Sequence, residues 1–373
     1  MTGDPALRLL ARLLPPAARG RYLEEWRADL AGASQVGLSG AGVLLGAIAL
    51  VVRIDRDRPE HTGEPRGTLP RRLARRGAGL VVAACGVLAG LYLTGGNTPD
   101  PGAAPVVGAG FLVAARVLAV IAAVAAASGA ILLVGAGFTA RTWLARASLL
   151  AVVCGPALLV VSVRGAVEGP VLPLAGLLIL LAGVAAGAVV LAGSGPLQLL
   201  PRSASRAQRL PVAAGGLALL VAVVVIGGID VLVWNPLSKV PTLPLPAIYE
   251  GMVERDGFSI GANVGAVAVW AAFWLAAGIA VTAAAATRHM SALTPRRIAI
   301  LLLALVSAAV FFRFFAGFGI GMSIADSFGV TGGDGSIASA LLAFVGQLAL
   351  AGAAVALGWA PRARMRRIEA TAG

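Results

Sequence analysis

The stretch from Pro211 to Trp234 constrains the fold more than any other part of this chain, because it is almost continuously apolar: PVAAGGLALLVAVVVIGGIDVLVW. A helix needs about 20 apolar residues to cross a hydrocarbon core about 30 Å thick. Arginines precede the stretch at positions 202, 206 and 209, and basic residues concentrate on the cytoplasmic side of membrane helices. The stretch is therefore predicted to be a transmembrane helix that starts in the cytoplasm and ends with Trp234 in the outer headgroup region.

Similar apolar stretches recur along the chain. Of its 373 residues, 58% are hydrophobic and 13% are charged, whereas about a quarter are charged in a soluble domain. The sequence predicts an all-α fold, a polytopic transmembrane helix bundle of about eight spans with an N-terminal amphipathic helix. The predicted spans are residues 78–95, 112–137, 147–163, 171–193, 211–234, 264–286, 298–316 and 337–359. A ninth is added if the shorter apolar run 37–52 crosses.

Basic residues alternate between the connections. Loops 96–111 and 317–336 contain no arginine or lysine, whereas 194–210 and 287–297 contain three arginines each. This distribution places 96–111, 235–263 and 317–336 outside and the C-terminus in the cytoplasm. A multi-pass protein of the bacterial plasma membrane is predicted, with the lipid bilayer as its first partner.

Composition divides the chain into five segments. They are a cytoplasmic amphipathic helical segment (1–36), a short apolar helix that is either interfacial or spanning (37–53), a basic cytoplasmic linker (54–76), the transmembrane bundle (77–360) and a basic cytoplasmic tail (361–373). If 37–52 spans, the N-terminus is outside. If it lies in the interface, the N-terminus is inside, which suits the arginines near it.

The helix predicted around Trp26 carries one apolar stripe. Tyr22, Trp26 and Leu30 recur at four-residue spacing, whereas Arg21 can pair with Glu25 away from them. The stripe is a candidate docking face for the membrane surface or for a cytoplasmic protein partner. The alternative is a solvated helix that caps the bundle from the cytoplasm.

The same region carries a resemblance. The run from Leu10 through Arg12 to Pro15, followed by RxRYxxEW from Arg19 to Trp26, is similar to the N-terminal LxRLxPxxxRxRYxxEW-type helical motif of many uncharacterised actinobacterial multi-pass membrane proteins. In those proteins the motif leads into several transmembrane helices. The resemblance covers a small part of the chain and implies no particular activity.

Residues that carry chemistry are sparse. The formal charge of the chain is +13. The arginines that give this charge lie mostly in short connections between apolar runs, so nucleic acid is not a predicted partner. Cys85 and Cys154 lie inside apolar runs and are interpreted as small buried hydrophobes. His61 and His289 have no second ligand at metal spacing. No phosphate-binding, hydrolase or zinc-protease motif is present. The sequence predicts no catalytic, cofactor or metal site, and it favours a non-enzymatic role.

Two charges nevertheless sit in apolar runs, Asp230 in IGGIDVLVW and Arg313 in VFFRFFAGF. Asp230 is about 6 Å before Trp234 at helical rise, and Arg313 is about 24 Å beyond the inner-face Arg297, so both fall in the outer leaflet. A charge at mid-helix costs about 2.5 to 3.5 kcal/mol on insertion scales. We therefore predict a structural ion pair between them. Arg116 is a competing partner for Asp230, and Arg313 can instead snorkel outward.

Three functions are compatible with these features. The first is a transporter-like protein or the membrane subunit of a larger system. The second is a signalling or regulatory protein with a cytoplasmic N-terminal docking helix. The third, an enzyme acting on lipid-linked substrates, needs clustered polar residues that the sequence hardly offers. In the outer loop 317–336, Gly317, Gly319 and Gly321 predict a bend, and Asp326 and Asp334 belong to turns.

Overall fold

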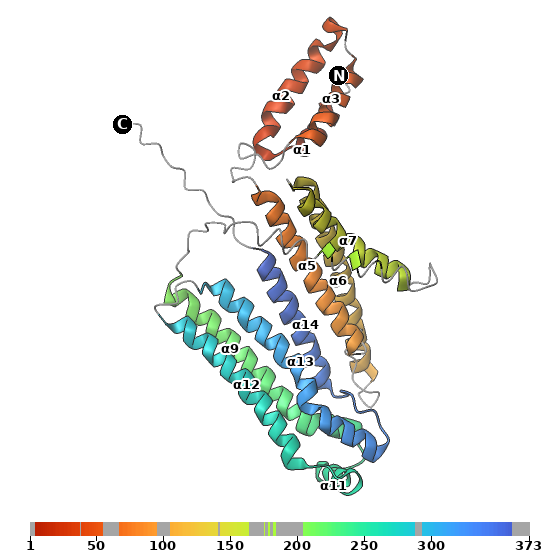
Figure 1. The fold of residues 1–373 in the computed structure, drawn as a ribbon, viewed down its shortest axis with the longest axis vertical. Coiled ribbons are helices and arrows are strands. Elements are labelled where there is room, and N and C mark those ends of the chain that lie inside the picture. Colours follow the sequence, from red (N-terminus) through yellow and green to blue (C-terminus); the bar gives the residue numbers. More distant parts are fainter. Residues whose placement is uncertain are drawn as a thin grey trace. The chain divides into compact units, whose positions relative to one another are not determined.

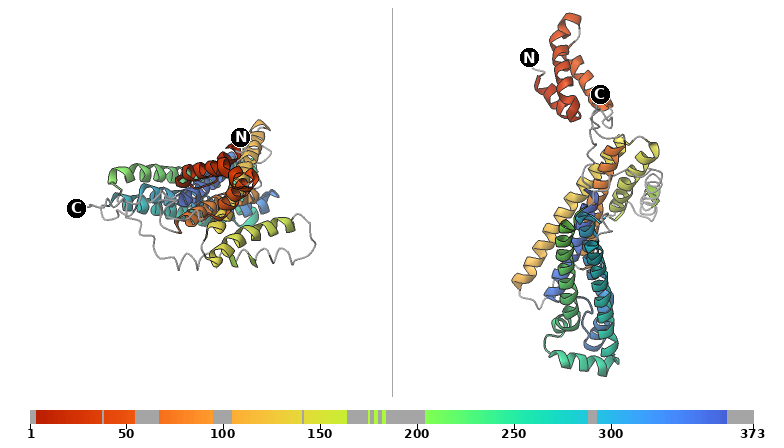
Figure 2. Two further views of the ribbon diagram at one scale, coloured as in Figure 1. Left: turned by 90° about the horizontal axis from the view of Figure 1, so that it is seen from above. Right: turned by 90° about the vertical axis from the view of Figure 1, so that its left-hand side faces the viewer.

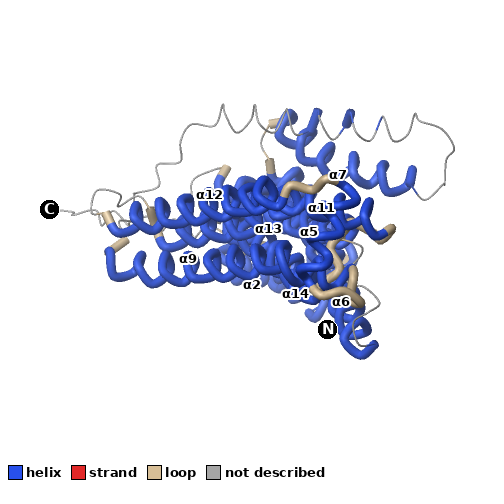
Figure 3. The backbone as a smooth tube through the Cα atoms, turned by 90° about the horizontal axis from the view of Figure 1, so that it is seen from below, coloured by secondary structure: helices blue, strands red, loops and turns tan. Residues whose placement is uncertain are grey.

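The computed structural model describes residues 4–37, 39–54, 67–94, 105–140, 142–163, 204–287 and 293–359, with single positions at 175, 178, 179, 182 and 183. Throughout these residues the secondary structure is helical, with no strand, as Figure 3 shows. They fall into two compact units, one drawn from 1–75, 130–197 and 360–373 and the other from 76–129 and 198–359. The predicted all-α class is confirmed.

Six helices within the described residues are long and apolar enough to cross a membrane. They are Thr68–Tyr92, Val106–Thr139, Arg206–Lys239, Ile260–Ala286, Pro295–Phe328 and Ile337–Gly358. The predicted count of eight spans is not confirmed. The span expected at 147–163 lies on helix α7 (Trp143–Val163), which is not among these six, and 171–193 lies almost wholly outside the described residues.

The N-terminal helices form a small cluster of their own. α1 (Asp4–Arg12), α2 (Pro16–Gly32) and α3 (Gly40–Arg53) contact one another. α2 begins with Pro16, where the fixed φ of proline suits a first helical turn. α3 begins after Ser39, whose hydroxyl accepts a hydrogen bond of 3.1 Å from the amide of Gly42. α3 has 14 residues, or about 21 Å of helix, which is less than the hydrocarbon thickness.

Four long helices make the bundle of the second unit (Figures 1 and 2). α9 (Arg206–Ile229) packs against α12 (Ile260–Ala286) and α13 (Pro295–Phe328), and α13 packs against α12 and α14 (Ile337–Gly358). Large apolar side chains fill the interior along the bundle. Val223, Trp270, Val306 and Ile320 belong to this core, all at most 7% exposed.

Short helices complete the end of the bundle that was predicted to lie outside. α9 continues without interruption into the π-helical turn η2 (Asp230–Trp234) and then α10 (Asn235–Lys239). α11 (Leu245–Asp256) follows and packs against α13. The predicted outer loop 235–263 is therefore mostly helical.

Small residues let α5 (Thr68–Leu93) approach α14 within the second unit. A Cβ added at Gly79 would lie 2.8 Å from the carbonyl oxygen of Ala354, and one at Gly90 would lie 2.7 Å from Gln347. Close approach of this kind joins helices in lipid, where hydrophobicity gives no driving force between them. A Cβ at Gly86 would likewise lie 2.5 Å from the side chain of Leu350 of α14, so these glycines form a packing seam between the two helices.

Arginines hold the opposite, predicted cytoplasmic, end of the bundle. Arg209 donates a 3.1 Å hydrogen bond to the carbonyl of Thr287, which ends α12. Arg296 donates to the carbonyls of Ala356 and Leu357, in the last turn of α14. Cations at helix C-termini are favourable because they complement the helix dipole and satisfy carbonyls that lack a helical partner.

Two sequence predictions, one about α13 and one about the two cysteines, are wrong. The first is the outer loop expected to begin at residue 317, with Gly317, Gly319 and Gly321 in a bend and Asp326 in a turn, because α13 continues as helix to Phe328 and leaves only residues 329–336 as a connection. These glycines are packing positions: a Cβ at Gly317 would lie 3.1 Å from the side chain of Val231. The second is the burial of Cys85 and Cys154, which are both exposed. An apolar run in a membrane-type helix does not tell which face neighbouring helices cover.

Candidate functional site

A cluster of charged and hydroxyl side chains joins the C-terminal end of α9, the middle of α13 and the N-terminal end of α14. We call it the ion-pair cluster; it comprises Asp230, Arg313, Asp334, Ser336 and Ser339. Arg313 donates from Nη1 to Asp230 Oδ2 and from Nη2 to Asp334 Oδ2. Asp230 is completely buried and Arg313 is 4% exposed. The ion pair predicted between Asp230 and Arg313 from their depths is present in the structure.

Two serines complete the shell around the buried carboxylate. Ser336 Oγ donates to Asp230 Oδ1, and Ser339 Oγ donates to Asp230 Oδ2 at 2.6 Å. Both oxygens of Asp230 are thus satisfied by hydroxyl and guanidinium donors. Because a buried carboxylate is tolerated only when it is paired and hydrogen-bonded, these contacts explain how Asp230 can be fully buried.

The π-helical turn η2 positions Asp230. The amide of Asn235 donates to the carbonyl of Asp230, five residues earlier, which is the π-helical spacing. The Tyr249 hydroxyl of α11 donates a 2.9 Å hydrogen bond to the carbonyl of Leu232 within the turn. Burial raises the pKa of the Tyr249 phenol above its ordinary value of 10.0, so this donor stays protonated at neutral pH.

A glycine makes room for Arg313. A Cβ added at Gly227 of α9 would lie 3.1 Å from Arg313 Cδ and 3.0 Å from the ring of Trp270. The indole of Trp270 is fixed in turn by a 3.1 Å hydrogen bond from Nε1 to the carbonyl of Ala309. Gly227, one turn before Asp230, therefore lets the guanidinium stem pass close to the α9 backbone.

The segment 329–336 is fastened over the end of the bundle at several points. Lys239 Nζ donates to Thr331 Oγ1 at 3.0 Å, and the Gly335 amide donates to Asn235 Oδ1 at 2.9 Å. Ser336 also caps α14, accepting a 2.9 Å bond from the amide of Ser339. The segment thus brings Asp334 and Ser336, and with them Ser339 in the first turn of α14, to the carboxylate of Asp230.

If these helices cross a bilayer, their lengths put the ion-pair cluster at one of its faces. α14 has 22 residues, about 33 Å at helical rise, so its N-terminal cap Ser336 reaches one boundary when the helix crosses. Asp230 follows Arg209 by about 32 Å of helix, which is close to one hydrocarbon thickness. The exposure of the Asp334 side chain, 47%, agrees with a location at the membrane boundary.

The geometry of the cluster is that of a clamp. Two carboxylates and one guanidinium bind one another and two hydroxyls, and within the described residues only Arg313 Nε among their side-chain atoms is buried without a partner. The contacts tie three helices together at one level.

The other predicted site residues lie elsewhere. Arg116 is exposed on α6 (Pro105–Thr139). Asp230 accepts hydrogen bonds from Arg313, Ser336 and Ser339 and not from Arg116, its predicted competing partner. Trp26 is 5% exposed and packs in the N-terminal cluster with Leu7 and Val51, with Tyr22 and Leu30 half-buried beside it. Much of the candidate docking face is therefore covered by α1 and α3.

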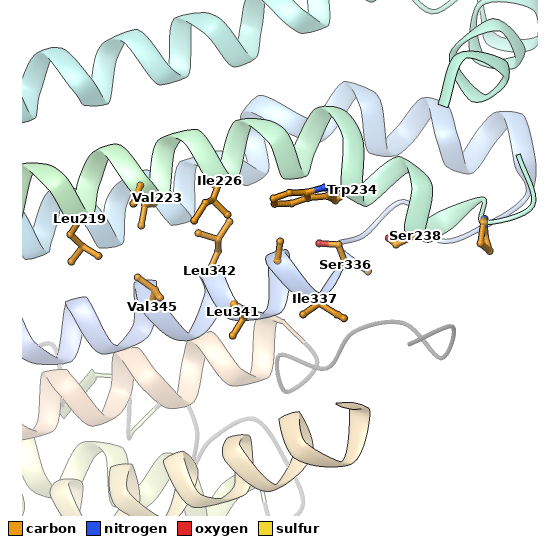
Figure 4. A pocket seen from close by; sticks show the side chains of 14 residues that line it. Leu219, Val223, Ile226, Trp234, Ser238, Ser336, Ile337, Leu341, Leu342 and Val345 are labelled. Atoms are coloured by element: carbon orange, nitrogen blue, oxygen red, sulfur yellow. The ribbon is translucent and has the colours of Figure 1, made fainter. Parts of the chain in front are cut away.

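A groove runs between α9 and α14 and ends beside the ion-pair cluster (Figure 4). It has a volume of about 840 Å³. Its apolar walls include Leu219, Ala222 and Ile226 of α9 and Leu341, Leu342 and Val345 of α14. At one end lie Trp234, Ser238 and Ser336. We call it the α9–α14 groove.

Sequence reasoning missed three members of the cluster: Asp334, Ser336 and Ser339. A signal was present, because a serine followed three residues later by a polar residue before an apolar run is typical of a helix start. That pattern places Ser336 at the cap of a helix. It does not tell that the capping hydroxyl also reaches a carboxylate more than a hundred residues earlier in the chain.

Comparison of the chain with protein-family models, curated proteins and solved structures gave no match. Within the described part of the chain, no group of three histidine, cysteine or acidic side chains is arranged to hold a metal ion; His61 and His289 lie outside it. The part of the chain that the structure describes thus defines a class, a helical protein with six helices able to cross a membrane in that part and a buried ion-pair cluster at one end of its bundle.

Proposed function

We propose that the chain is an integral protein of the bacterial plasma membrane. Of the two roles considered, a transporter-like protein and the membrane subunit of a larger system, we propose the second. The observation that carries the choice is the tight closure of the bundle. Its interior is filled by large apolar side chains, and its two ends are tied by the ion-pair cluster and by Arg209 and Arg296. A rigid body of this kind suits a scaffold, whereas transport requires the clamp to open.

Two measurements test the proposal. In membranes from the cells that encode it, the chain should migrate in native gels as a complex larger than the same chain expressed alone. A single size in both settings would contradict the subunit role. Independently, resistance to alkaline carbonate extraction tests the membrane location, and release into the supernatant would contradict it.

Orientation is tested by cysteine labelling. Single cysteines at Thr98, Ser259 and Ser203 are placed in a chain whose Cys85 and Cys154 are replaced. The proposed topology expects an impermeant thiol reagent to label 98 and 259 on intact cells and 203 only after lysis. Labelling of 203 but not 259 on intact cells would invert the topology.

A signalling protein with a cytoplasmic N-terminal docking segment is the second candidate. The observation that favours it is the separate N-terminal cluster, which leaves Leu9 of α1 and Leu13 in the turn that follows 62% and 56% exposed. We expect Leu13→Glu to leave the cluster folded and to weaken contact with a cytoplasmic partner. Trp26→Glu should unfold the cluster, because Trp26 is buried. Limited proteolysis of the full chain and site-specific cross-linking in cells separate the two outcomes. If Leu13→Glu changes no cross-link, docking through this face is wrong.

A further inference from the structure

The walls of the α9–α14 groove are carbon over most of their length. Leu219, Ala222 and Ile226 face Leu341, Leu342 and Val345 from the other helix. An apolar cavity of this kind does not hold ordered water, because water there finds no hydrogen-bond partners. Both helices are long and apolar enough to cross a membrane, so the medium beside the groove is lipid. The occupant that matches the walls is an acyl chain.

The far end of the groove has a different chemistry. Trp234 is 41% exposed there, and Ser238, Gly335 and Ser336 also line it. Tryptophan is enriched at the headgroup level of membranes, and the lengths of α9 and α14 put this end at a bilayer boundary. A ligand that fills the groove therefore has an apolar tail along the helices and a polar end near Ser336.

Charge decides what that polar end is. The ion-pair cluster contains two carboxylates and one guanidinium, so it carries one net negative charge. The nearby ammonium of Lys239 is 8% exposed and donates to Thr331. Asp334 is the exposed member of the cluster, at 47%, and stands directly before the groove residues Gly335 and Ser336 in the chain. A partly solvated carboxylate at headgroup level favours a cationic group.

We propose that the α9–α14 groove is a binding site for one membrane phospholipid with an amine-bearing headgroup. One acyl chain lies between α9 and α14, and the ammonium of the headgroup pairs with Asp334. This inference rests on the proposed membrane location, but not on the subunit role. Bound lipid would shield the exposed side of the cluster and fill the α9–α14 groove.

The acyl-chain part is tested by filling the groove. Ala222 is exposed and lines it, so Ala222→Trp occupies the space without disturbing buried contacts. Val225→Trp is the matched control, because Val225 lies within a turn of Ala222 on α9, is 50% exposed and does not line the groove. The full chain is purified in mild detergent, stripped of lipid and titrated with phosphatidylethanolamine in native mass spectrometry. We expect one bound lipid, an affinity at least about tenfold lower for Ala222→Trp, and an unchanged affinity for Val225→Trp.

The headgroup part is tested by a second lipid and a second variant. Phosphatidylglycerol with identical acyl chains should bind about fivefold more weakly, as expected for the loss of one partly exposed ion pair. Asp334→Asn should remove this preference and leave binding of the chain itself. Thermal unfolding of each variant, together with the Val225→Trp control, separates a loss of binding from a loss of fold.

Several results would overturn the lipid proposal or the membrane location on which it rests. If wild-type protein that resists carbonate extraction retains no lipid, or if Ala222→Trp binds as well as wild type, the groove is not a lipid site, although the membrane location stands. Equal or tighter binding of phosphatidylglycerol overturns the assignment of an amine-bearing headgroup. Release of the chain by carbonate overturns the proposed membrane location itself.

Discussion

Replacing Arg313 by alanine tests the physical account of the ion-pair cluster most directly. The change removes the guanidinium that binds Asp230 and Asp334 together. Asp230 would stay completely buried with only the two serine hydroxyls as donors. Removing one partner of a buried ion pair typically destabilises by about 3 to 5 kcal/mol, because the remaining charge is uncompensated. We expect a loss of unfolding free energy in that range for Arg313→Ala.

The other members of the cluster should respond differently. Asp230→Ala leaves Arg313 bound to the half-exposed Asp334, so the loss should be smaller, about 1.5 to 3 kcal/mol, as for a hydrogen bond to a charged group. Asp334→Ala should cost at most about 1 kcal/mol, because solvent screens a pair whose acidic side chain is 47% exposed. The double variant Asp230→Ala, Arg313→Ala should lose less than the sum of the two single losses, since neither charge remains alone.

The measurement is reversible unfolding of the full chain in detergent, followed by tryptophan fluorescence and analysed as a double-mutant cycle. The slope against denaturant must stay constant among the variants, so that midpoints report stability. Strictly additive losses would show that the two buried charges do not interact. A loss for Asp334→Ala as large as that for Arg313→Ala would show that burial does not set the energies in this cluster.

Two further predictions concern the neighbouring backbone. Gly332→Ala should destabilise by about 1 to 3 kcal/mol, because its Cβ would lie 2.6 Å from the carbonyl oxygen of Gly321. The control is Gly333→Ala, whose Cβ would have nothing within 4 Å and which should change stability by less than about 0.5 kcal/mol in the same assay. Equal effects of the two variants would contradict the close packing of Gly332 against Gly321. Tyr249→Phe should cost about 1 kcal/mol at neutral pH through the lost bond to Leu232. Because the folded-state pKa of Tyr249 is raised, the contribution of this phenol to stability is fully present below the ordinary value of 10.0 and is lost as pH rises through the folded-state value. The decline in stability above pH 10 should therefore be shallower in Tyr249→Phe than in wild type. An identical alkaline profile for the two proteins would contradict this prediction.

What the sequence predicted well was local. Long apolar runs become membrane-length helices because bilayer thickness and helical rise together set their length. Counting residues from flanking arginines and from Trp234 was also enough to put Asp230 and Arg313 at similar depth, and the structure joins them. The count of spans was not confirmed, because α3 is apolar but short and most of 171–193 lies outside the described residues.

What the sequence did not predict depends on contacts between distant residues. Ser339 gives no sign of its bond to Asp230, since each is separately compatible with its own helix. The bend expected at Gly317 was wrong because close packing against Val231 outweighs the low helix propensity of glycine, about 1 kcal/mol per residue. The stripe containing Trp26 was correctly read as apolar, but periodicity cannot show that α1 and α3 cover it.

The π-helical turn at Asp230–Trp234 has a consequence for the register of the chain. A π turn holds one residue more than an α-helical turn, so every side chain beyond it is rotated by about 100° from where an uninterrupted α-helix would place it. That rotation aims Asn235 at the amide of Gly335 and Lys239 at Thr331. Shortening the turn by a single residue would leave the composition and apolar length of α9 nearly unchanged, yet it would turn both side chains away from the 329–336 segment. Length variation at this turn is therefore far less tolerable than substitution of its apolar residues.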